Sequence, residues 1–343
     1  MTLTLSIVSA GPSVTVQDMG RTGLLAAGLA RGGAADRLAL LEAAALLAQA
    51  TPQAALEMAG FGGRFRFSAP TRIALTGAPM RATLEGAPLR WNASHLIPEG
   101  VTLEIGPAEA GIYGYLGVAG GIVTPPQLGA RATQASAGIG HRLRAGDTLP
   151  VGDDPAPETP LLTLPEAHRF KGGTLRVIEG PQSGYFSADT RARFFATAFP
   201  AQAGNRQGLT LGCEAPFTIE TGGSILSEPI TAGDIQMTGA GVPAILLAEC
   251  QTIGGYPRIG TVIPADLPLA AQTPQGATLR FRPVTLAEAE AACPSETRQL
   301  ETLRAAVSPL RRTGFDTYAL LGGQLIGGAI RGDEEEPWRA GST

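Results

Sequence analysis

The sequence predicts a mainly β fold made of two halves. Glycine and proline are abundant, with 46 Gly and 27 Pro in 343 residues, while aromatic residues make up only 5%. Together with short hydrophobic runs, that composition is typical of many short strands joined by tight turns. Residues 156–170 are rich in proline and acids and show no hydrophobic period, which predicts a linker between the halves. A chain of this length has room for two domains.

In the first half, apolar and polar residues alternate in several short runs, which predicts strands. The expected strands cover residues 3–9, 64–67, 72–75, 101–105 and 112–118, with a hairpin at 80–89. Asp36 is a suitable N-cap for an alanine-rich helix ending near Gln49, because apolar residues recur at near-helical spacing from Leu40 to Leu47. These elements define a predicted N-terminal domain of residues 1–155.

The second half, predicted to span residues 171–288, is also rich in strands. A strand at 175–178 precedes a short helix at 188–196 that Ser187 can cap. Further on, strands at 245–248 and 260–263 flank a bend. Thr285 and Glu288 then form a capping box that opens a helix, and Ser295 starts another. Residues 289–343 are therefore expected to form a helical extension that ends in a solvated tail.

Charge and hydropathy exclude several classes of partner. The chain carries 26 basic and 30 acidic residues, for a net charge of −4, and no basic stripe appears. Nucleic acids and anionic membranes are therefore poor partners. The N-terminus lacks the basic region of a signal peptide and no run of 18 apolar residues occurs, so we expect a cytoplasmic protein. Cys213, Cys250 and Cys293 are odd in number and far apart, which favours a reducing compartment.

Lysine usage excludes two kinds of cofactor site. Lys171 is the only lysine, and Gly172-Gly173 follow it in place of the Ser or Thr of a nucleotide-binding P-loop. The Met-Lys-Met acceptor of a biotin carrier is absent as well. If ATP or biotin takes part, we expect it to arrive on another polypeptide. The three histidines do not stand at metal-binding spacing, so no zinc site is predicted.

Polar residues beside a Gly-Gly bend are the first candidates for a functional site. Glu249 and Gln251 precede Gly254-Gly255, and Asp266 follows the next strand. Glycine lets a ligand approach the backbone closely, so such a bend can form a pocket wall. A hairpin with solvated polar ends explains the same pattern.

A glycine-punctuated loop at residues 11–23 is the second candidate. It carries Gln17, Asp18 and Arg21. The planar fork of arginine suits carboxylates and phosphates. A surface pair between Asp18 and Arg21 is the alternative, and such pairs contribute little to stability.

Six short motifs, in order, resemble one known family. They are TVQDMGRTG at 15–23, GGAAD at 32–36, LGARAT at 128–133 with GHRL at 140–143, NRQG at 205–208, GDIQ at 233–236 and CQTIGGYPRIGTVIPADL at 250–267. The chain from about residue 11 to 288 is thus similar to the allophanate hydrolase subunit 2 family. That family includes the carboxyltransferase domain of urea carboxylase, the C subunit of bacterial 5-oxoprolinase and the regulator KipA.

The resemblance implies a cyclophilin-like β-barrel in each half, with a shared cleft as the site. The residues that it implies for catalysis are Arg206, Glu228, Gln236, Glu249 and Asp266. Those that it implies for substrate binding are Gln17, Asp18, Arg21, Arg131, Arg142, Asn205, Gln251, Gly254, Gly255, Tyr256 and Gln272. The arginines would stabilise phosphate or carboxylate, and the carboxylates Glu228, Glu249 and Asp266 would hold Mg²⁺.

Three functions follow from the resemblance. The first is a subunit of an ATP-dependent, Mg²⁺-dependent 5-oxoprolinase, acting with a B-type (KipI-like) subunit and an A-type subunit on a small amide. The second is carboxyl transfer from carboxybiotin, supplied in trans, to urea or a related amide. The third is a KipA-like regulatory protein without turnover. Departures from the family pattern at Ala44, Ala130, Ala132 and Cys250 are compatible with lost chemistry.

Overall fold

The computed structural model describes residues 3–219 and 225–310, which are mainly β as predicted. The described residues up to Pro309 belong to one compact unit. The predicted tail from Asp333 onward lies outside the described residues. No helix of the described part is both long and apolar enough to cross a membrane.

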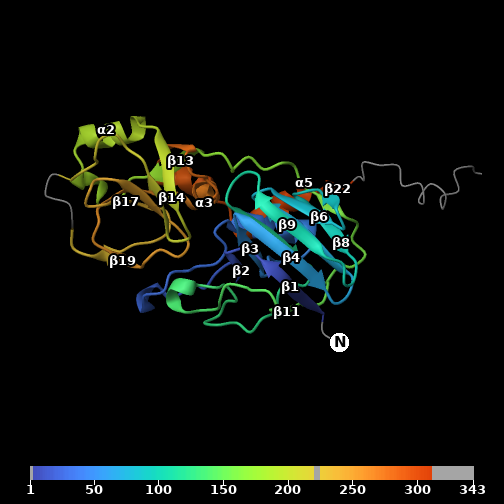
Figure 1. Cartoon of the computed structure of the whole chain (residues 1–343). Helices are drawn as coiled ribbons and strands as arrows, with labels where there is room; N and C mark the ends of the chain where they lie inside the picture. The colour runs from blue at the N-terminus through green and yellow to red at the C-terminus, as the bar shows by residue number, and fades with distance from the viewer. Residues whose placement is uncertain (1–2, 220–224, 311–343) are drawn as a thin grey trace, which may run out of the picture. The chain divides into compact units, whose positions relative to one another are not determined.

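The first half holds its strands in two sheets (Figure 1). The six-stranded sheet has the order β11 (Thr148–Pro150), β1 (Thr4–Ala10), β4 (Phe61–Phe67), β9 (Leu103–Ala108), β6 (Met80–Leu84) and β7 (Ala87–Leu89). The seven-stranded sheet has the order β2 (Val14–Gln17), β3 (Ala55–Ala59), β10 (Tyr113–Val118), β5 (Thr71–Gly77), β8 (Ala93–Ile97), β12 (Leu162–Thr163) and β22 (Ser308–Pro309). Buried residues from both sheets, such as Phe65 and Leu116, form one core cluster, so the sheets pack face to face.

Helix α1 (Arg37–Leu46) covers the seven-stranded sheet. Asp36 caps it as predicted, because its side chain accepts a hydrogen bond from the Ala39 N–H. The helix contacts β5 and β10, and the Thr76 hydroxyl of β5 donates to the Ala39 carbonyl at 2.9 Å. The start of α1 therefore lies beside Glu57 and Tyr115 of this sheet.

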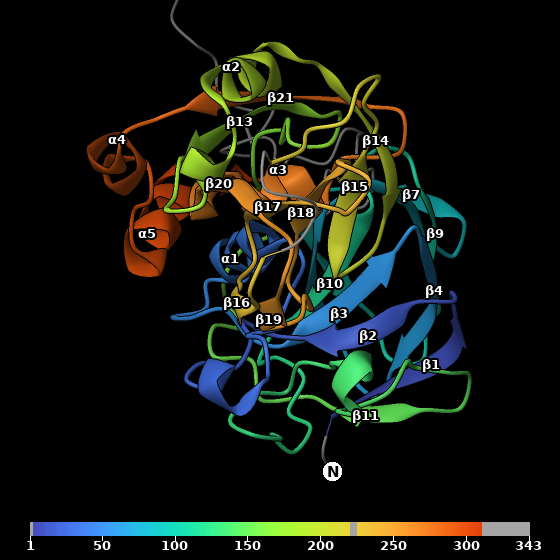
Figure 2. The same cartoon turned by 90° about the vertical axis from the view of Figure 1, so that its left-hand side faces the viewer.

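The second half contains the predicted barrel, which is closed. Its strand order is β13 (Gly173–Ile178), β20 (Arg258–Val262), β17 (Asp234–Met237), β18 (Pro243–Leu246), β15 (Gly208–Leu211), β14 (Phe199–Gly204) and β21 (Thr278–Pro283). Helix α2 (Ala188–Ala196) contacts β21 (Figure 2). It places Phe194 against Phe281, with ring centroids 4.8 Å apart. The shorter elements beside the barrel are α3 (Leu267–Ala271), β16 (Glu228–Pro229) and β19 (Ile253–Gly254).

The structure differs from the sequence-based expectations in three places. Closure into a barrel occurs in the second half, whereas the first half forms the two facing sheets. Residues 14–17, expected in a loop, form β2, because β3 offers them a hydrogen-bonding edge. Residues 156–170, expected as a linker, contribute β12 to the first-half sheet, where Thr163 pairs with Ala93 of β8.

The predicted helical extension returns to the first half. The capping box of Thr285 and Glu288 opens α4 (Leu286–Ala291), and Ser295 caps α5 (Glu296–Ala306), both as expected. Helix α5 packs on α1, and β22 then pairs with β12. The C-terminal end of the described chain therefore adds a strand to the seven-stranded sheet of the first half.

Candidate functional site

Arg206 joins the two halves through hydrogen bonds to three groups. It lies in the turn between β14 and β15, and its side chain is 17% exposed. Its Nε donates to Glu249 Oε1 at 2.6 Å, and its Nη2 donates to the Gly33 carbonyl at 2.5 Å. Its Nη1 donates to Glu57 Oε1 of β3. A single guanidinium thus binds carboxylates from both halves.

Glu57 also connects Arg206 to the residues that precede α1. Its Oε2 accepts from the Tyr115 hydroxyl at 2.6 Å and from the Ala35 N–H at 2.8 Å. The Tyr115 oxygen in turn accepts from the Asp36 N–H at 2.8 Å. Because Glu57 and Tyr115 face each other on paired strands, the sheet register fixes this arrangement.

Arg169 completes the network, and Gln272 binds its Asp36 side chain. The Arg169 Nε donates to Asp36 Oδ2 at 2.7 Å, and its two terminal nitrogens bind the two oxygens of Glu42 at 2.7 Å each. Gln272 donates to Asp36 Oδ2 at 2.9 Å, while its own oxygen accepts from the N–H groups of Ile112 and Tyr113. We call the seven side chains of Glu249, Arg206, Glu57, Tyr115, Asp36, Arg169 and Glu42 the buried ion network.

Burial and charge shift the proton affinities in this network. Burial alone would lower the pKa of Arg206, but the carboxylates of Glu57 and Glu249 outweigh it and raise that pKa. Burial raises the pKa of Glu42, against the opposing effect of Arg169. It also raises the pKa of Tyr115 well above its usual value, and the neighbouring Glu57 charge adds to that shift. Tyr115 therefore serves as a hydrogen-bond donor to Glu57.

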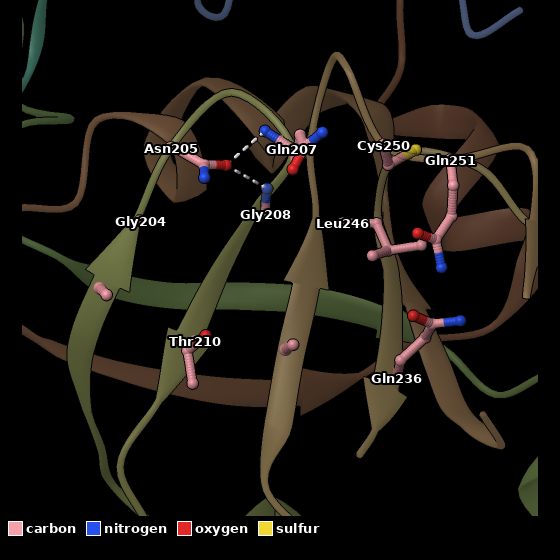
Figure 3. A pocket seen from close by; sticks show the side chains of 11 residues that line it. Gly204, Asn205, Gln207, Gly208, Thr210, Gln236, Leu246, Cys250 and Gln251 are labelled. Atoms are coloured by element: carbon pink, nitrogen blue, oxygen red, sulfur yellow. Dashed lines mark hydrogen bonds between the residues drawn. The ribbon is translucent and has the colours of Figure 1, made fainter. Parts of the chain in front are cut away.

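A cavity of about 320 Å³ lies on the outer face of the barrel, beside the turn that carries Arg206. Leu209, Ile235 and Ile245 point into the barrel core, so their sequence neighbours line the cavity from β15, β17 and β18. The lining residues are Ala203, Gly204, Asn205, Gln207, Gly208, Thr210, Gln236, Ala244, Leu246, Cys250 and Gln251. None of these described residues carries a charge, and four of them carry carboxamides (Figure 3).

Gln236 lines this cavity with a carboxamide side chain. The residue is only 4% exposed, and within the described residues its Nε2 has no hydrogen-bond partner. Gln251 lies beside it in Figure 3. A Cβ atom at Gly254 would meet Gln236 Nε2 at 2.7 Å and Gln251 Nε2 at 3.5 Å. Glycine at this position therefore leaves room where two amide nitrogens converge.

The rim of the cavity is held by local hydrogen bonds. The Asn205 side-chain oxygen accepts from the Gln207 N–H at 2.7 Å and from the Gly208 N–H at 3.3 Å (Figure 3). This Asx turn fixes the sharp bend that also sends Arg206 to the ion network. Asn205 thus shapes the cavity, and its oxygen is already used.

Glu228 belongs to a separate cluster around Arg258. Arg258 binds Glu228 at 2.9 Å and Asp234 at 3.2 Å. Gln182 donates to Glu228 Oε2 at 2.6 Å and accepts from the Arg258 N–H at 2.9 Å. The carboxylate of Glu228 is therefore balanced by its own arginine.

The predicted residues of the first-half loop hold a neighbouring backbone segment. Gln17 donates to the Thr133 carbonyl at 3.0 Å, and Arg21 donates to the Ala132 carbonyl at 2.6 Å. Asp18 accepts from the Arg131 N–H at 2.6 Å. All three thus use polar atoms to fix residues 131–133, the segment that carries Arg131.

The structure brings some of the predicted residues together and separates others. Arg206, Glu249 and Gln272 join the interface between the halves, and Asn205, Gln236 and Gln251 line the cavity. Gly254 adjoins Gln236, whereas Gly255 lies against Ile225 and Tyr256 is 42% exposed. Arg142 is exposed and does not line the cavity.

The three carboxylates expected to hold Mg²⁺ do not converge. Glu249 binds Arg206, Glu228 binds Arg258 and Asp266 binds Arg176 at 2.5 Å. No group of three or more His, Cys, Asp or Glu residues suited to a metal ion occurs among the described residues. The expectation of a shared Mg²⁺ site on these residues is therefore wrong, because each carboxylate already has a guanidinium partner.

Sequence reasoning missed the first-half side of the ion network. Glu57 and Glu42 are 1% and 4% exposed, and Arg169 stands in the segment predicted to be a linker. An acidic residue inside an otherwise apolar strand, as in ALEMA at 55–59, is the signal that could have pointed to Glu57.

Comparison with known families identifies the chain at the domain level. The family model described as "Carboxyltransferase domain, subdomain A and B" matches residues 27–283. The chain belongs to this carboxyltransferase family. The match spans Glu57, Arg206, the outer cavity and Gln272, so the ion network and the cavity both lie within the family domain.

Relatives of this carboxyltransferase-family protein carry two kinds of name. The chain is 30% identical to the C subunit of 5-oxoprolinase from Haemophilus influenzae, covering 83% of this chain and 93% of the relative. It is 32% identical to the protein of the same name from Escherichia coli, covering 87% and 97%. It is 27% identical to the urea amidolyase of Lachancea kluyveri, covering 87% of this chain but 18% of that protein.

Solved structures agree with this fold. The crystal structure of TTHA0988 is similar with a TM-score of 0.75 and 32% identity, over 82% of this chain and 56% of that chain. The urea amidolyase of K. lactis has a TM-score of 0.80 at 24% identity, over 88% of this chain. The carboxyltransferase-family protein therefore spans about half of the TTHA0988 chain and 20% of the yeast enzyme.

Proposed function

We propose that this protein is the C-type component of an ATP-dependent 5-oxoprolinase that opens 5-oxoproline to glutamate. It acts together with a B-type and an A-type subunit. The observation that carries the proposal is the uncharged outer cavity lined by four carboxamide side chains, among them the buried Gln236, whose Nε2 has no partner among the described residues. The relatives named as C subunits of 5-oxoprolinase support it, since this chain matches them over nearly their whole length.

A lactam fits the chemistry of the cavity. The carbonyl oxygen of a cyclic amide accepts hydrogen bonds, and its N–H donates one. Gln236 and Gln251 line one side with carboxamide groups, which can donate to such a carbonyl and accept from the N–H. Leu246 and Ala244 offer apolar contact to the ring.

The overall reaction consumes 5-oxoproline, ATP and water and yields glutamate, ADP and phosphate. Transfer of the γ-phosphoryl group to the lactam oxygen makes the ring carbon electrophilic, and attack by water then breaks the C–N bond. The nitrogen leaves with a proton as the amine of γ-glutamyl phosphate, and a second water hydrolyses this acyl phosphate to glutamate and phosphate. In this proposal a partner protein binds ATP with its Mg²⁺, because the three candidate carboxylates of this chain do not form a metal site. This chain binds and orients the lactam.

The test is reconstitution of the protein with the B-type and A-type subunits of the same organism. We expect glutamate formation that depends on ATP, on 5-oxoproline and on all three proteins. Gln236→Leu keeps the side-chain volume but removes the donor, and we expect the KM for 5-oxoproline to rise about tenfold, as loss of one buried hydrogen bond predicts. Gln53→Leu in the first half, where Gln53 bonds only within its own loop, is the matched control.

Two outcomes would overturn the proposal. The first is a reconstituted complex that forms no glutamate although all three proteins are folded. The second is a Gln236→Leu complex that is as active as wild type at low 5-oxoproline concentration.

Carboxyl transfer is the second candidate function. The urea amidolyase relatives and the family description favour it. A ureido ring, like a lactam, presents a carbonyl flanked by N–H, so the same cavity suits carboxybiotin supplied by a separate carrier. Carboxylation of urea by this protein plus a biotinylated carrier, without glutamate formation from 5-oxoproline, would select this function.

A further inference from the structure

A second cavity, of about 210 Å³, lies in the first half, apart from the residues that line the barrel cavity. Its walls are largely apolar, with Val16 of β2, Leu149 of β11 and Leu143 between them. Two basic side chains, Arg131 and His141, also line it, and none of its described lining residues is acidic. The cavity therefore combines a hydrocarbon surface with the positive charge of Arg131, while His141 lies 3.4 Å from an Asp147 carboxylate oxygen.

Arg131 enters this cavity with unused hydrogen-bonding capacity. Its backbone N–H is bound by Asp18, but among the described residues its buried Nε has no hydrogen-bond partner. None of the ion pairs within the described part of the chain includes its guanidinium. A buried donor on a cation is costly to leave unpaired, so an anionic ligand would find a favourable partner here.

The backbone that carries Arg131 is held in place by the loop after β2. Gln17 and Arg21, both almost fully buried, bind the carbonyls of Thr133 and Ala132. Asp18 fixes the Arg131 N–H from the same loop. Such support lowers the conformational cost of binding, because the arginine does not have to be ordered by the ligand.

We infer that this cavity is a binding site for a small carboxylate with an apolar body, whose carboxylate pairs with the Arg131 guanidinium. The planar fork of arginine matches the two oxygens of a carboxylate. Val16 and Leu149 provide the surface for a short hydrocarbon chain. The site involves other residues than the lactam cavity, so it stands independently of the proposed reaction.

Isothermal titration of the full-length protein with butyrate tests the site, with butyramide as the uncharged probe of the same shape. We expect butyrate to bind and butyramide to bind at least tenfold more weakly. Arg131→Gln should weaken butyrate binding roughly 10- to 100-fold, the range expected for charge-assisted hydrogen bonds. The control Arg144→Gln, an exposed arginine on the same segment, should bind butyrate as the wild type does.

A second variant guards against misfolding of Arg131→Gln. Ala130 lines the cavity at 3% exposure, so Ala130→Leu fills the space while keeping the arginine. We expect it to lose butyrate binding while keeping its circular dichroism spectrum. Absence of butyrate binding by the wild type at about 50 mM, a concentration matching a free energy of binding near 2 kcal/mol, equal binding of butyramide, or unchanged binding by either cavity variant would overturn the inference.

Discussion

Glu57 is the residue on which the buried ion network depends most. Its two oxygens accept from Arg206 on one side and from Tyr115 and Ala35 on the other, and its side chain is 2% exposed. Removing one partner of a buried pair leaves the other charge without compensation, which is usually more costly than the pair is stabilising.

Replacing Glu57 by Gln should therefore lower the free energy of unfolding by about 3 kcal/mol. Urea denaturation followed by circular dichroism measures this value. Glu104→Gln is the matched control, because Glu104 pairs with Arg64 on the surface and should change stability by less than about 0.5 kcal/mol. Similar losses for both variants would show that Glu57 is not the main anchor of the network.

Cys250 offers a pH-dependent readout of the outer cavity. Burial raises the pKa of its thiol to about 11, and the charge of Asp234 contributes to the shift. The thiolate is the reactive form, so a raised pKa means less thiolate at every pH below about 11. In the folded protein, alkylation of Cys250 should therefore accelerate about tenfold per pH unit up to about pH 11.

The measurement uses iodoacetamide on a Cys213→Ser/Cys293→Ser variant, with the extent of alkylation followed by mass spectrometry. The same variant in urea is the control, and its rate should level off near the pKa of an ordinary thiol. A plateau at the same pH in the folded protein would contradict the burial of Cys250.

At the scale of elements, α5 matters because it covers α1. Leu300 is 4% exposed and packs with Leu41, Ala44 and Ala45 of α1. We expect Leu300→Ala to destabilise the protein by about 2–4 kcal/mol, the range for deleting a buried leucine. Thermal unfolding by calorimetry checks it, with Leu286→Ala as control, since Leu286 is 62% exposed. If Leu286→Ala lowers the stability as much as Leu300→Ala does, the packing of Leu300 on α1 does not contribute as described.

Several elements were predictable because their signals are local. Asp36, Ser187, Thr285 and Ser295 cap helices as expected, since a cap depends on residues three positions away. Strands β2 and β12 were not predictable, because four and two residues gain stability only from the neighbouring strand. A strand of two to four residues is too short to show an alternation of apolar and polar residues, and its pairing partner lies far away in the sequence.

The candidate site was predictable only in part for the same reason. Motifs of the second half pointed to Arg206, Gln236 and Glu249, which the structure places at the interface and the cavity. Their first-half partners come from distant elements, as the separation of 149 residues between Arg206 and Glu57 illustrates. No local pattern encodes such a pairing. Asp266, predicted as a catalytic candidate, binds Arg176 in the structure.

At the scale of the whole molecule, the halves are connected by polar contacts as well as by the chain. Arg206 and Gln272 of the second half bind Glu57 and Asp36 of the first. Residues of both halves, among them Tyr115 and Leu175, also share one hydrophobic cluster. The two halves on either side of the predicted boundaries at 155 and 171 are thus in direct contact with each other.

The return of α5 and β22 to the first half has a consequence for how the gene can be divided. A fragment that stops at residue 155 would lack β12, β22 and the helix that shields Leu41 of α1. Its sheet would end in an open edge beside an uncovered apolar surface, the combination that drives self-association. If the two halves were expressed as separate polypeptides, the N-terminal one would therefore need the residues that form β12, α5 and β22 to be present as well.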